Sequence, residues 1–501
     1  MTLRDKLFHS ILLARQRVYE FGSETPLEEI IHDGIHFFLK REDASLIHAY
    51  KWRGACNRMA LLTAEERARG VICASAGNHA QGVAWAAARL GIKAKIYMPE
   101  VAPRMKRLAV QRIGGDWVET IIHGDSFGEA SQEARRVQQA EGSIYIHPYD
   151  DMETMAGQGT LADEIVMSGK GPIDVAYVQI GGGGMAAAVA CWLKNFWPNI
   201  RIVGVEGEQQ ASMAAALRAG RPVALDYVDV FADGTAVNRV GDLTYPLCAE
   251  LIDEFITVTN EEICAAIQML WEESRCLPEP AGAMGMAGAM KQREQLRGKK
   301  VLCIVCGANM DFGQLAYISR HAGIGAATRQ YYRFQIVESK GTFLGLVEAM
   351  RGEGVNIIEF QYGKTEEKRA FPVIGFEASP QVFALLEKRA ADLGIPCWRV
   401  TGAEDVEFRM IHYEPSTFRR PFFMTFEFPE RAGALRDFLG AVQHAGSMVY
   451  CNYVYTGERV GHALMGYEFD SEEDRKEFIR IVGSYGSQWK ELAPDVVSRI
   501  L

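Results

Sequence analysis

Between residues 37 and 308, short runs of β-branched and aromatic residues alternate with alanine-rich stretches, and this alternation constrains the fold more than any other feature. The run 70–74 precedes a helix-forming stretch over 80–90, and another run follows at 94–98. The same order returns around residues 175–205. A strand–helix–strand rhythm predicts parallel sheets covered by helices, with ligand-binding loops at the carboxyl ends of the strands.

After about residue 325 the sequence changes to strand-like stretches of alternating polarity, each followed by a helix-like stretch. Residues 332–338 alternate, and Gly341 leads into a helix-like stretch over 342–351. The order recurs ninety-two residues later, where Phe334, Ile336, Glu338, Gly341, Phe343 and Val347 correspond to Phe426, Phe428, Glu430, Gly433, Leu435 and Leu439. Each copy continues in a β-α-β-β-α-β order, which predicts two modules of split βαβ type. A chance match between two amphipathic units is the alternative.

A chain of 501 residues is too long for a single hydrophobic core. The change of pattern predicts an α/β domain over residues 1–325, followed by α+β modules over 326–413 and 420–501. Forty-eight percent of the residues are hydrophobic and 24% are charged, which is typical of a globular protein.

Charge and hydropathy exclude several classes of partner. A formal net charge of −10 leaves no basic surface for nucleic acid. No apolar run approaches the ~20 residues that a membrane-spanning helix needs. The first 21 residues have apolar positions at roughly helical spacing but lack the continuous apolar core of a secretory signal, so we expect a packed helix in a cytoplasmic protein.

The ten cysteines lie among apolar neighbours, as expected for buried thiols in a reducing compartment. Cys303 and Cys306 have the C-x-x-C spacing that also occurs in redox and zinc sites. However, the run 301–306 is typical of a buried strand, on which residues three apart point to opposite faces. We therefore expect neither a disulfide nor a metal site there.

Lys51 is the first candidate for chemistry. It follows the β-rich run 37–43, and the small residues Gly54 and Ala55 allow close packing beneath it. A lysine forms a Schiff base only when it is deprotonated, which requires burial or a nearby positive group. A lysine beside an aromatic residue is more often a solvated surface charge, so this position alone leaves both interpretations open.

The second candidate is a segment of small and polar residues at the start of the helix expected over 80–90. It consists of Ser75, Ala76, Gly77, Asn78 and His79, followed by Ala80, Gln81 and Gly82. Such residues expose backbone N–H groups at a helix start, where an anion binds readily. A plain helix cap is the alternative for the serine and the asparagine, and the histidine is equally compatible with a packed residue.

The third candidate is a run of four glycines between a strand at 175–180 and a helix that starts near Met185. The run consists of Gly181, Gly182, Gly183 and Gly184. Glycines let a phosphate approach the backbone, and the helix dipole favours its charge. No Lys-Ser or Lys-Thr follows, so a nucleoside-triphosphate loop is excluded. A dinucleotide site stays open, because Ala186 completes G-x-G-x-x-A and Glu206 ends the next strand.

The fourth candidate is the segment Cys306–Asn309, which follows a strand at 301–305, together with the upstream segment Glu279–Ala283. The end of a parallel strand is a position that faces ligands in such sheets. A buried core thiol is the alternative for Cys306.

Together, in this order and spacing, the four motifs resemble the pyridoxal-phosphate enzymes of the tryptophan-synthase β fold type. Within that group the chain is most similar to the biosynthetic threonine deaminases, whose paired carboxyl-terminal ACT-like modules match the repeat. The resemblance runs from about Val18 to the end and implies two parallel-sheet αβα subdomains followed by two ACT-like modules.

The resemblance also implies a role for each motif. Lys51 stands at the cofactor-linked lysine, and Asn78 stands where the family hydrogen-bonds the phenolic oxygen of the cofactor. Residues Ser75–His79 correspond to the cradle of the substrate carboxylate, and Gly181–Gly184 with Met185 correspond to the phosphate loop. Cys306 stands opposite the pyridine nitrogen. The segment Ala156–Thr160 is similar to a further active-site segment.

The function implied is dehydration and deamination of L-threonine, with L-serine as a related substrate, to give 2-oxobutanoate and ammonia for isoleucine synthesis. Family habit implies a tetramer with isoleucine and valine as effectors. Three alternatives stay open: a β-replacement enzyme or a dehydratase for another β-substituted amino acid, a non-catalytic amino-acid sensor, and a nicotinamide oxidoreductase.

Three departures from the family pattern limit these inferences. Ala49 replaces the serine that precedes the aromatic–lysine pair, which puts the substrate in doubt. Ser212 stands where metal-dependent racemases of this fold have an acid, so a racemase of that kind is disfavoured. Lys340 and Ala432 replace the proline common before the ACT glycine, which puts the effector in doubt.

Overall fold

The computed structural model describes residues 1–352, 354–429, 433–454, 460–485 and 488–500. The chain divides into two compact units, residues 1–325 and 326–501. None of the helices in these ranges has the length and apolar character needed to cross a membrane.

The first unit contains a six-stranded sheet in the order β1-β2-β10-β7-β8-β9. Its strands are β1 (Leu27–His32), β2 (Ile35–Arg41), β7 (Val175–Gln179), β8 (Arg201–Gly207), β9 (Glu254–Val258) and β10 (Lys300–Val305). β1 and β2 are antiparallel, and all other neighbours are parallel. Every residue of β7 is buried, as expected for a central strand of a parallel sheet.

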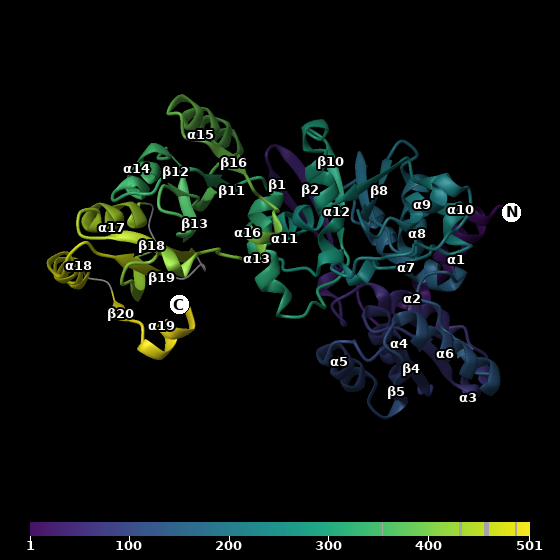
Figure 1. Ribbon diagram of the computed structural model, residues 1–501. Helices are drawn as coiled ribbons and strands as arrows, with labels where there is room; N and C mark the ends of the chain where they lie inside the picture. Colours follow the sequence, from purple (N-terminus) through teal and green to yellow (C-terminus); the bar gives the residue numbers. More distant parts are fainter. Residues whose placement is uncertain (353, 430–432, 455–459, 486–487, 501) are drawn as a thin grey trace. The chain divides into compact units, whose positions relative to one another are not determined.

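A second, four-stranded sheet in the same unit has the order β5-β4-β3-β6 and is parallel throughout. Its strands are β3 (Val71–Ala74), β4 (Ala94–Met98), β5 (Val118–Ile122) and β6 (Ile144–Tyr145). With α4 (Asn78–Leu90), α5 (Arg104–Gly114) and α6 (Phe127–Glu141) it forms a separate lobe, seen below the larger sheet in Figure 1. The predicted pair of parallel-sheet subdomains is confirmed.

Helices complete both lobes. The remaining helices of this unit are α1 (Leu3–Val18), α2 (Lys51–Ala60), α3 (Ala64–Arg69), α7 (Met152–Met167), α8 (Gly184–Phe196), α9 (Ser212–Ala219), α10 (Thr244–Leu251), α11 (Asn260–Ser274), α12 (Pro280–Lys291) and α13 (Gln314–Gly325). The packed amino-terminal helix is confirmed, since α1 buries Leu7, Ile11 and Val18. α2 packs against α4 of the smaller lobe and α7 of the larger one, so it lies where the lobes meet.

The second unit is built on one eight-stranded antiparallel sheet, in the order β16-β11-β15-β13-β18-β19-β17-β20. Its strands are β11 (Arg329–Phe334), β13 (Asn356–Gly363), β15 (Val373–Glu377), β16 (Cys397–Arg399), β17 (Phe422–Pro429), β18 (Ser447–Val454), β19 (Val460–Glu468) and β20 (Trp489–Glu491). The short strands β12 (Ile336–Val337) and β14 (Arg369–Ala370) pair separately. Its helices are α14 (Thr342–Ala349), α15 (Pro380–Asp392), α16 (Glu404–Glu407), α17 (Ala434–Val442), α18 (Glu472–Ser484) and α19 (Pro494–Ile500).

The predicted repeat appears as two copies of a β-α-β-β-α-β order, β11-α14-β13-β15-α15-β16 and β17-α17-β18-β19-α18-β20. The matched glycines Gly341 (φ +80°) and Gly433 (φ +86°) both stand before a helix in the left-handed region that glycine adopts readily. Glu430 and Ala432 lie outside the described residues. Pairing of β13 with β18 joins the copies into one sheet, and α14, α15, α17 and α18 share one core on it.

Candidate active site

Lys51 is the first residue of α2 and is held against the end of β10 by backbone hydrogen bonds. The Tyr50 amide donates to the Cys306 carbonyl at 3.1 Å, and the Ala308 amide donates to the His48 carbonyl at 2.9 Å. The Lys51 ammonium nitrogen donates to the Pro148 carbonyl at 3.0 Å. Two sequence candidates that are 255 residues apart, Lys51 and Cys306, therefore lie side by side.

Burial lowers the pKa of Lys51 to about 8, although Cys306 and the Glu279 carboxylate act in the opposite direction. Desolvation disfavours the charged ammonium, and its hydrogen bond goes to a backbone carbonyl rather than to a carboxylate. A substantial fraction of the amine is therefore neutral near pH 8, which nucleophilic or basic chemistry requires.

Close contact with α7 fixes the helix that carries Lys51. A Cβ on Gly157 would overlap the Arg53 carbonyl, and a Cβ on Gly54 would overlap the Gln158 side chain. Gln158 accepts a hydrogen bond from the Gly54 amide at 3.2 Å. The segment Ala156–Thr160, which sequence similarity assigned to the active site, thus packs beneath α2 in this structure.

A buried group of two cations and two carboxylates supports the same helix. Arg53 donates through Nε and Nη2 to the Glu42 carboxylate at 2.8 and 2.9 Å, and it also pairs with Glu164. Lys40 pairs with Glu164 as well and donates to the Thr25 carbonyl at 2.6 Å. Because all four charged side chains are buried, their charges must balance within the group.

The glycine run forms a tight loop between β7 and α8. Gly183 has φ +92°, and a Cβ on Gly182 would overlap the Tyr149 ring. A Cβ on Gly184 would lie 2.7 Å from the Tyr149 carbonyl, so side chains are excluded along the loop. Pro148 contacts Lys51 and the adjacent Tyr149 contacts this loop, which brings the loop to the lysine.

The loop offers unused hydrogen-bond donors. In the described part of the chain, the backbone amides of Gly181–Gly184 donate to no protein group, and Met185 follows in the buried first turn of α8. These amides stand at the positive end of the α8 dipole, and no acidic side chain lies in the loop. The donor set fits a phosphate monoester, as pyridoxal phosphate requires.

The segment at the start of α4 offers a similar set of amides. The Gly77 amide donates to the Ser75 hydroxyl at 3.2 Å, whereas the amides of Ala76, Asn78 and His79 donate to no described group. His79 Nε2 lies 2.9 Å from the Ile146 carbonyl, and burial lowers the pKa of His79 to about 3. The imidazole is therefore neutral near pH 7 and is bonded to the backbone. This favours the interpretation of His79 as a packed residue.

Asn78 and the segment after β10 meet at Glu279, a residue whose importance the sequence reasoning missed. Asn78 donates from Nδ2 to Glu279 Oε1 at 2.7 Å, and it accepts at Oδ1 from Asn309 Nδ2 at 2.8 Å. The Glu279 amide donates to the Gly307 carbonyl at 3.0 Å. Glu279 and Asn309 both lie in motifs singled out above, so the signal that could have identified them was present. The contacts of Pro148 and Tyr149 have no comparable sequence signal.

Cys306 is buried beside this group. Desolvation, with the Glu279 charge adding to it, raises the pKa of its thiol well above the usual value, so the thiol stays protonated. All ten cysteines are free, and the described residues contain no cluster of side chains suited to a metal ion.

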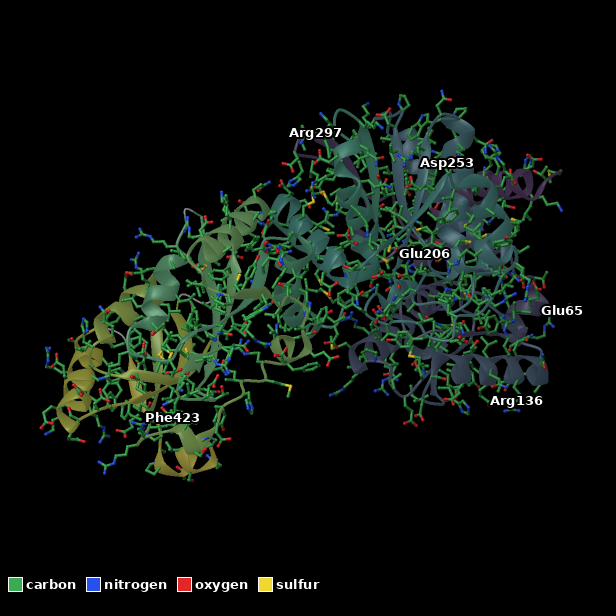
Figure 2. The ribbon with its side chains drawn as sticks, turned by 45° about the horizontal axis from the view of Figure 1, so that its top comes forward. Glu65, Arg136, Glu206, Asp253, Arg297 and Phe423 are labelled. Carbon is green, nitrogen blue, oxygen red and sulfur yellow. The ribbon has the colours of Figure 1, made fainter. Side chains whose placement is uncertain are left out.

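Glu206, labelled in Figure 2, lies near the end of β8. Its two carboxylate oxygens accept hydrogen bonds from the Met213 and Ala214 amides at 2.7 and 2.9 Å, so it caps α9. The sequence position that suggested a dinucleotide site is thus occupied by a structural carboxylate.

Two family profiles match the chain. One described as pyridoxal-phosphate dependent enzyme matches residues 18–307, and one described as C-terminal regulatory domain of threonine dehydratase matches residues 416–499. The chain is 35% identical over 495 residues to the biosynthetic L-threonine dehydratase of Burkholderia multivorans, with 97% of each chain covered. It is 38% identical over 475 residues to the corresponding protein of Escherichia coli, covering 92% of this chain and 90% of that one.

Solved structures match about two thirds of the chain. Processed threonine deaminase isoform 2 from Solanum lycopersicum is 41% identical with a TM-score of 0.61, over 64% of this chain and 94% of that chain. Maize serine racemase is 34% identical with a TM-score of 0.58, over 63% and 97%. Pyridoxal phosphate is thus the cofactor, and the chain belongs to the family of biosynthetic threonine dehydratases.

Proposed function

We propose that this protein converts L-threonine, with L-serine as a related substrate, to the 2-oxo acid and ammonia, as the first step of isoleucine synthesis. The observation that carries the proposal is the partly buried Lys51 amine, whose pKa is lowered to about 8, beside a glycine loop with free amides, in a chain similar throughout to biosynthetic threonine dehydratases. The net reaction converts threonine to 2-oxobutanoate and ammonia, because the water lost from Cβ is balanced by the water that releases ammonia.

Different residues hold the cofactor, bind the substrate and accept the proton. Bound pyridoxal phosphate supplies a conjugated ring that takes up electron density from the substrate Cα. Lys51 holds the cofactor and then accepts the Cα proton at its amine. Gly181–Gly184 and Met185 bind the phosphate, and the amides of Ser75–His79 bind the substrate carboxylate. Cys306 stands where the family faces the ring nitrogen, and its neutral thiol would leave that nitrogen unprotonated, which would favour elimination over other reactions at Cα.

Assay of 2-oxobutanoate after mixing the pure protein with threonine tests the proposal. We expect product from the wild-type protein and none from Lys51→Ala, with loss of the visible absorption of the bound cofactor. Absence of product from every β-hydroxy and β-chloro amino acid would refute it. A binding protein for amino acids would instead retain threonine without turnover.

Ala49 supports a second candidate, action on another β-substituted amino acid. Here the Ser45 hydroxyl donates to the Ala49 carbonyl at 2.9 Å and accepts from the Ala49 amide at 3.0 Å. The backbone before Lys51 is thus anchored by a residue outside the family motif. A panel of β-substituted amino acids, with and without an added thiol, separates dehydration from β-replacement.

The second unit is proposed to regulate the first. We assign residues 326–413 and 420–501 to two ACT-like modules, in a cytoplasmic homotetramer. A pocket between α14 and α17 is lined in part by Lys340, Phe343, Gln443 and Tyr467, and isoleucine and valine are its proposed ligands. Sedimentation tests the tetramer, and the substrate assay with each amino acid added tests the regulation.

A further inference from the structure

Three side chains form a hydrogen-bond chain whose direction is determined at both ends. Asn309 donates two hydrogen bonds from its Nδ2, one to the Ile47 carbonyl at 2.7 Å and one to Asn78 Oδ1 at 2.8 Å. Asn78 Nδ2 then donates to Glu279 Oε1 at 2.7 Å. A carbonyl only accepts and an ionised carboxylate only accepts, so the Asn78 amide has a single orientation that satisfies both neighbours.

This orientation matters for what Asn78 offers a ligand. One hydrogen of its Nδ2 is bound to Glu279, and the other is left for a further acceptor. A flipped amide would set Oδ1 against the carboxylate and Nδ2 against the Asn309 donor, which loses two partly buried hydrogen bonds. The same flip would replace the donor that faces the ligand with an acceptor.

Glu279 contacts the site through Gly307 and Asn78. A Cβ on Gly307 would lie 2.5 Å from Glu279 Oε1 and 3.1 Å from Asn78 Nδ2, and Gly307 pairs with Ala49, two residues before Lys51. Asn78 is the first residue of α4, in the smaller lobe, whereas Glu279 precedes α12, in the larger lobe. The chain therefore also links the two lobes.

Several charged groups face Glu279. Asp233, next to α12 in the fold, forms an ion pair with Lys106 of α5, and these two charges act on the carboxylate in opposite directions. Lys51 and Cys306 lie within electrostatic range from α2 and the end of β10. Burial, followed by Asp233, raises the pKa of Glu279 to about 7, so its charge changes near neutral pH.

We propose that Glu279 is a positioning residue that, together with Asn309, fixes the Asn78 amide so that an N–H faces the cofactor. The inference rests on the proposed role of Asn78 at the cofactor. A charged acceptor holds an amide more strongly than a neutral one, so the orientation is best defined when Glu279 is ionised. Cofactor affinity then depends on pH through a residue that does not touch the cofactor.

The test measures cofactor binding as well as turnover. The full-length apoprotein is titrated with pyridoxal phosphate between pH 5.5 and 9, with quenching of tryptophan fluorescence as the signal, and absorption spectra are recorded for each loaded protein. The variants are Glu279→Gln, Glu279→Ala, Asn309→Ala and Asn78→Ala. Glu294→Gln, on an exposed carboxylate with 73% side-chain accessibility, is the matched control.

For Glu279→Ala and Asn309→Ala we expect the dissociation constant to rise about tenfold with a shifted absorption band, since each variant loses one of the two hydrogen bonds that orient the Asn78 amide. Glu279→Gln retains an acceptor for the Asn78 amide, so we expect its affinity for the cofactor to be close to that of the wild type. Because glutamine does not ionise, the change of affinity near pH 7 that the wild type and the Glu294→Gln control show should be absent from this variant. Wild-type affinity and spectra in Glu279→Ala would overturn the inference. If that variant fails to fold, an unchanged pH profile in Glu279→Gln overturns it equally.

These outcomes separate the inference from the proposed function. If Asn78→Ala loses affinity for the cofactor and Glu279→Ala and Asn309→Ala do not, the positioning role is refuted and the proposed function is not. Altered binding in Asn78→Ala, Glu279→Ala and Asn309→Ala supports the positioning role even if threonine is not turned over, since the measured quantity is cofactor affinity.

Discussion

The buried charge group beneath α2 makes a quantitative prediction about stability. Glu164 is shared by Lys40 and Arg53, and Glu42 is the other carboxylate of the group. Glu164→Gln leaves two buried cations with one carboxylate, an uncompensated charge. Breaking a buried pair in this way costs about 3 to 5 kcal/mol.

A second substitution separates charge balance from simple loss of contacts. Lys40→Met together with Glu164→Gln removes one charge of each sign and leaves the two-bond Arg53–Glu42 pair intact. We expect the double variant to be more stable than the sum of the single effects predicts, by about 1 to 3 kcal/mol. Glu133→Gln is the control, because its partner Arg136 is 68% exposed and such pairs contribute below about 1 kcal/mol.

Urea unfolding of the full-length apoprotein measures these effects. Tryptophan fluorescence reports mainly on the first unit, which contains six of the eight tryptophans. Burial raises the pKa of Glu164, but Arg53 and Lys40 outweigh it and hold the pKa below 4.5. The carboxylate thus stabilises the fold above pH 4.5, and the cost of Glu164→Gln should shrink as the pH falls below that value. Strictly additive single effects, or a cost that does not depend on pH, would refute the reasoning.

Three further predictions follow from the site. The rate at which the apoprotein captures pyridoxal phosphate should rise with pH and level off above about 8, the pKa of Lys51, because only the neutral amine reacts. Stopped-flow absorption measures this rate, and a rate that does not change with pH would contradict the prediction. Gly182→Ala should weaken cofactor binding and cost about 1 to 3 kcal/mol through overlap with Tyr149. Gly128→Ala, whose new methyl group would meet only the Ser126 hydroxyl at an ordinary contact distance of 3.8 Å, should leave urea stability and binding nearly unchanged. Burial raises the pKa of Glu206 to about 7, so this carboxyl contributes a loss of stability as the pH rises from 4.5 to 7. Glu206→Gln should remove this contribution from the pH dependence of urea unfolding and leave those of Glu279 and Glu338, whose pKa values are also raised to about 7, while cofactor affinity stays constant. A fall in affinity would contradict the role of Glu206 as a helix cap.

Much of the fold was accessible from the sequence because it is encoded in short-range patterns. Strand and helix periodicities repeat every few residues, so the αβα arrangement and the β-α-β-β-α-β copies could be predicted. The limits of elements were less certain: the helix expected over 80–90 begins at Asn78, and that expected over 342–351 ends at Ala349. Capping and tertiary contacts decide these ends, and they leave weak sequence signals.

The sequence by itself determined which residues are proposed to carry the chemistry, since Lys51, Asn78, the glycine loop and Cys306 are each marked by a local motif. Only the tertiary structure decided what surrounds them. Glu279 reaches Asn78 across 201 residues, and Pro148 reaches Lys51 across 97. Joining of the two carboxyl-terminal copies into one sheet likewise depends on the pairing of β13 with β18. Such contacts join segments that are far apart in the chain, and no periodic pattern in the sequence marks them. They depend on how helices and strands pack together rather than on neighbouring residues in the chain.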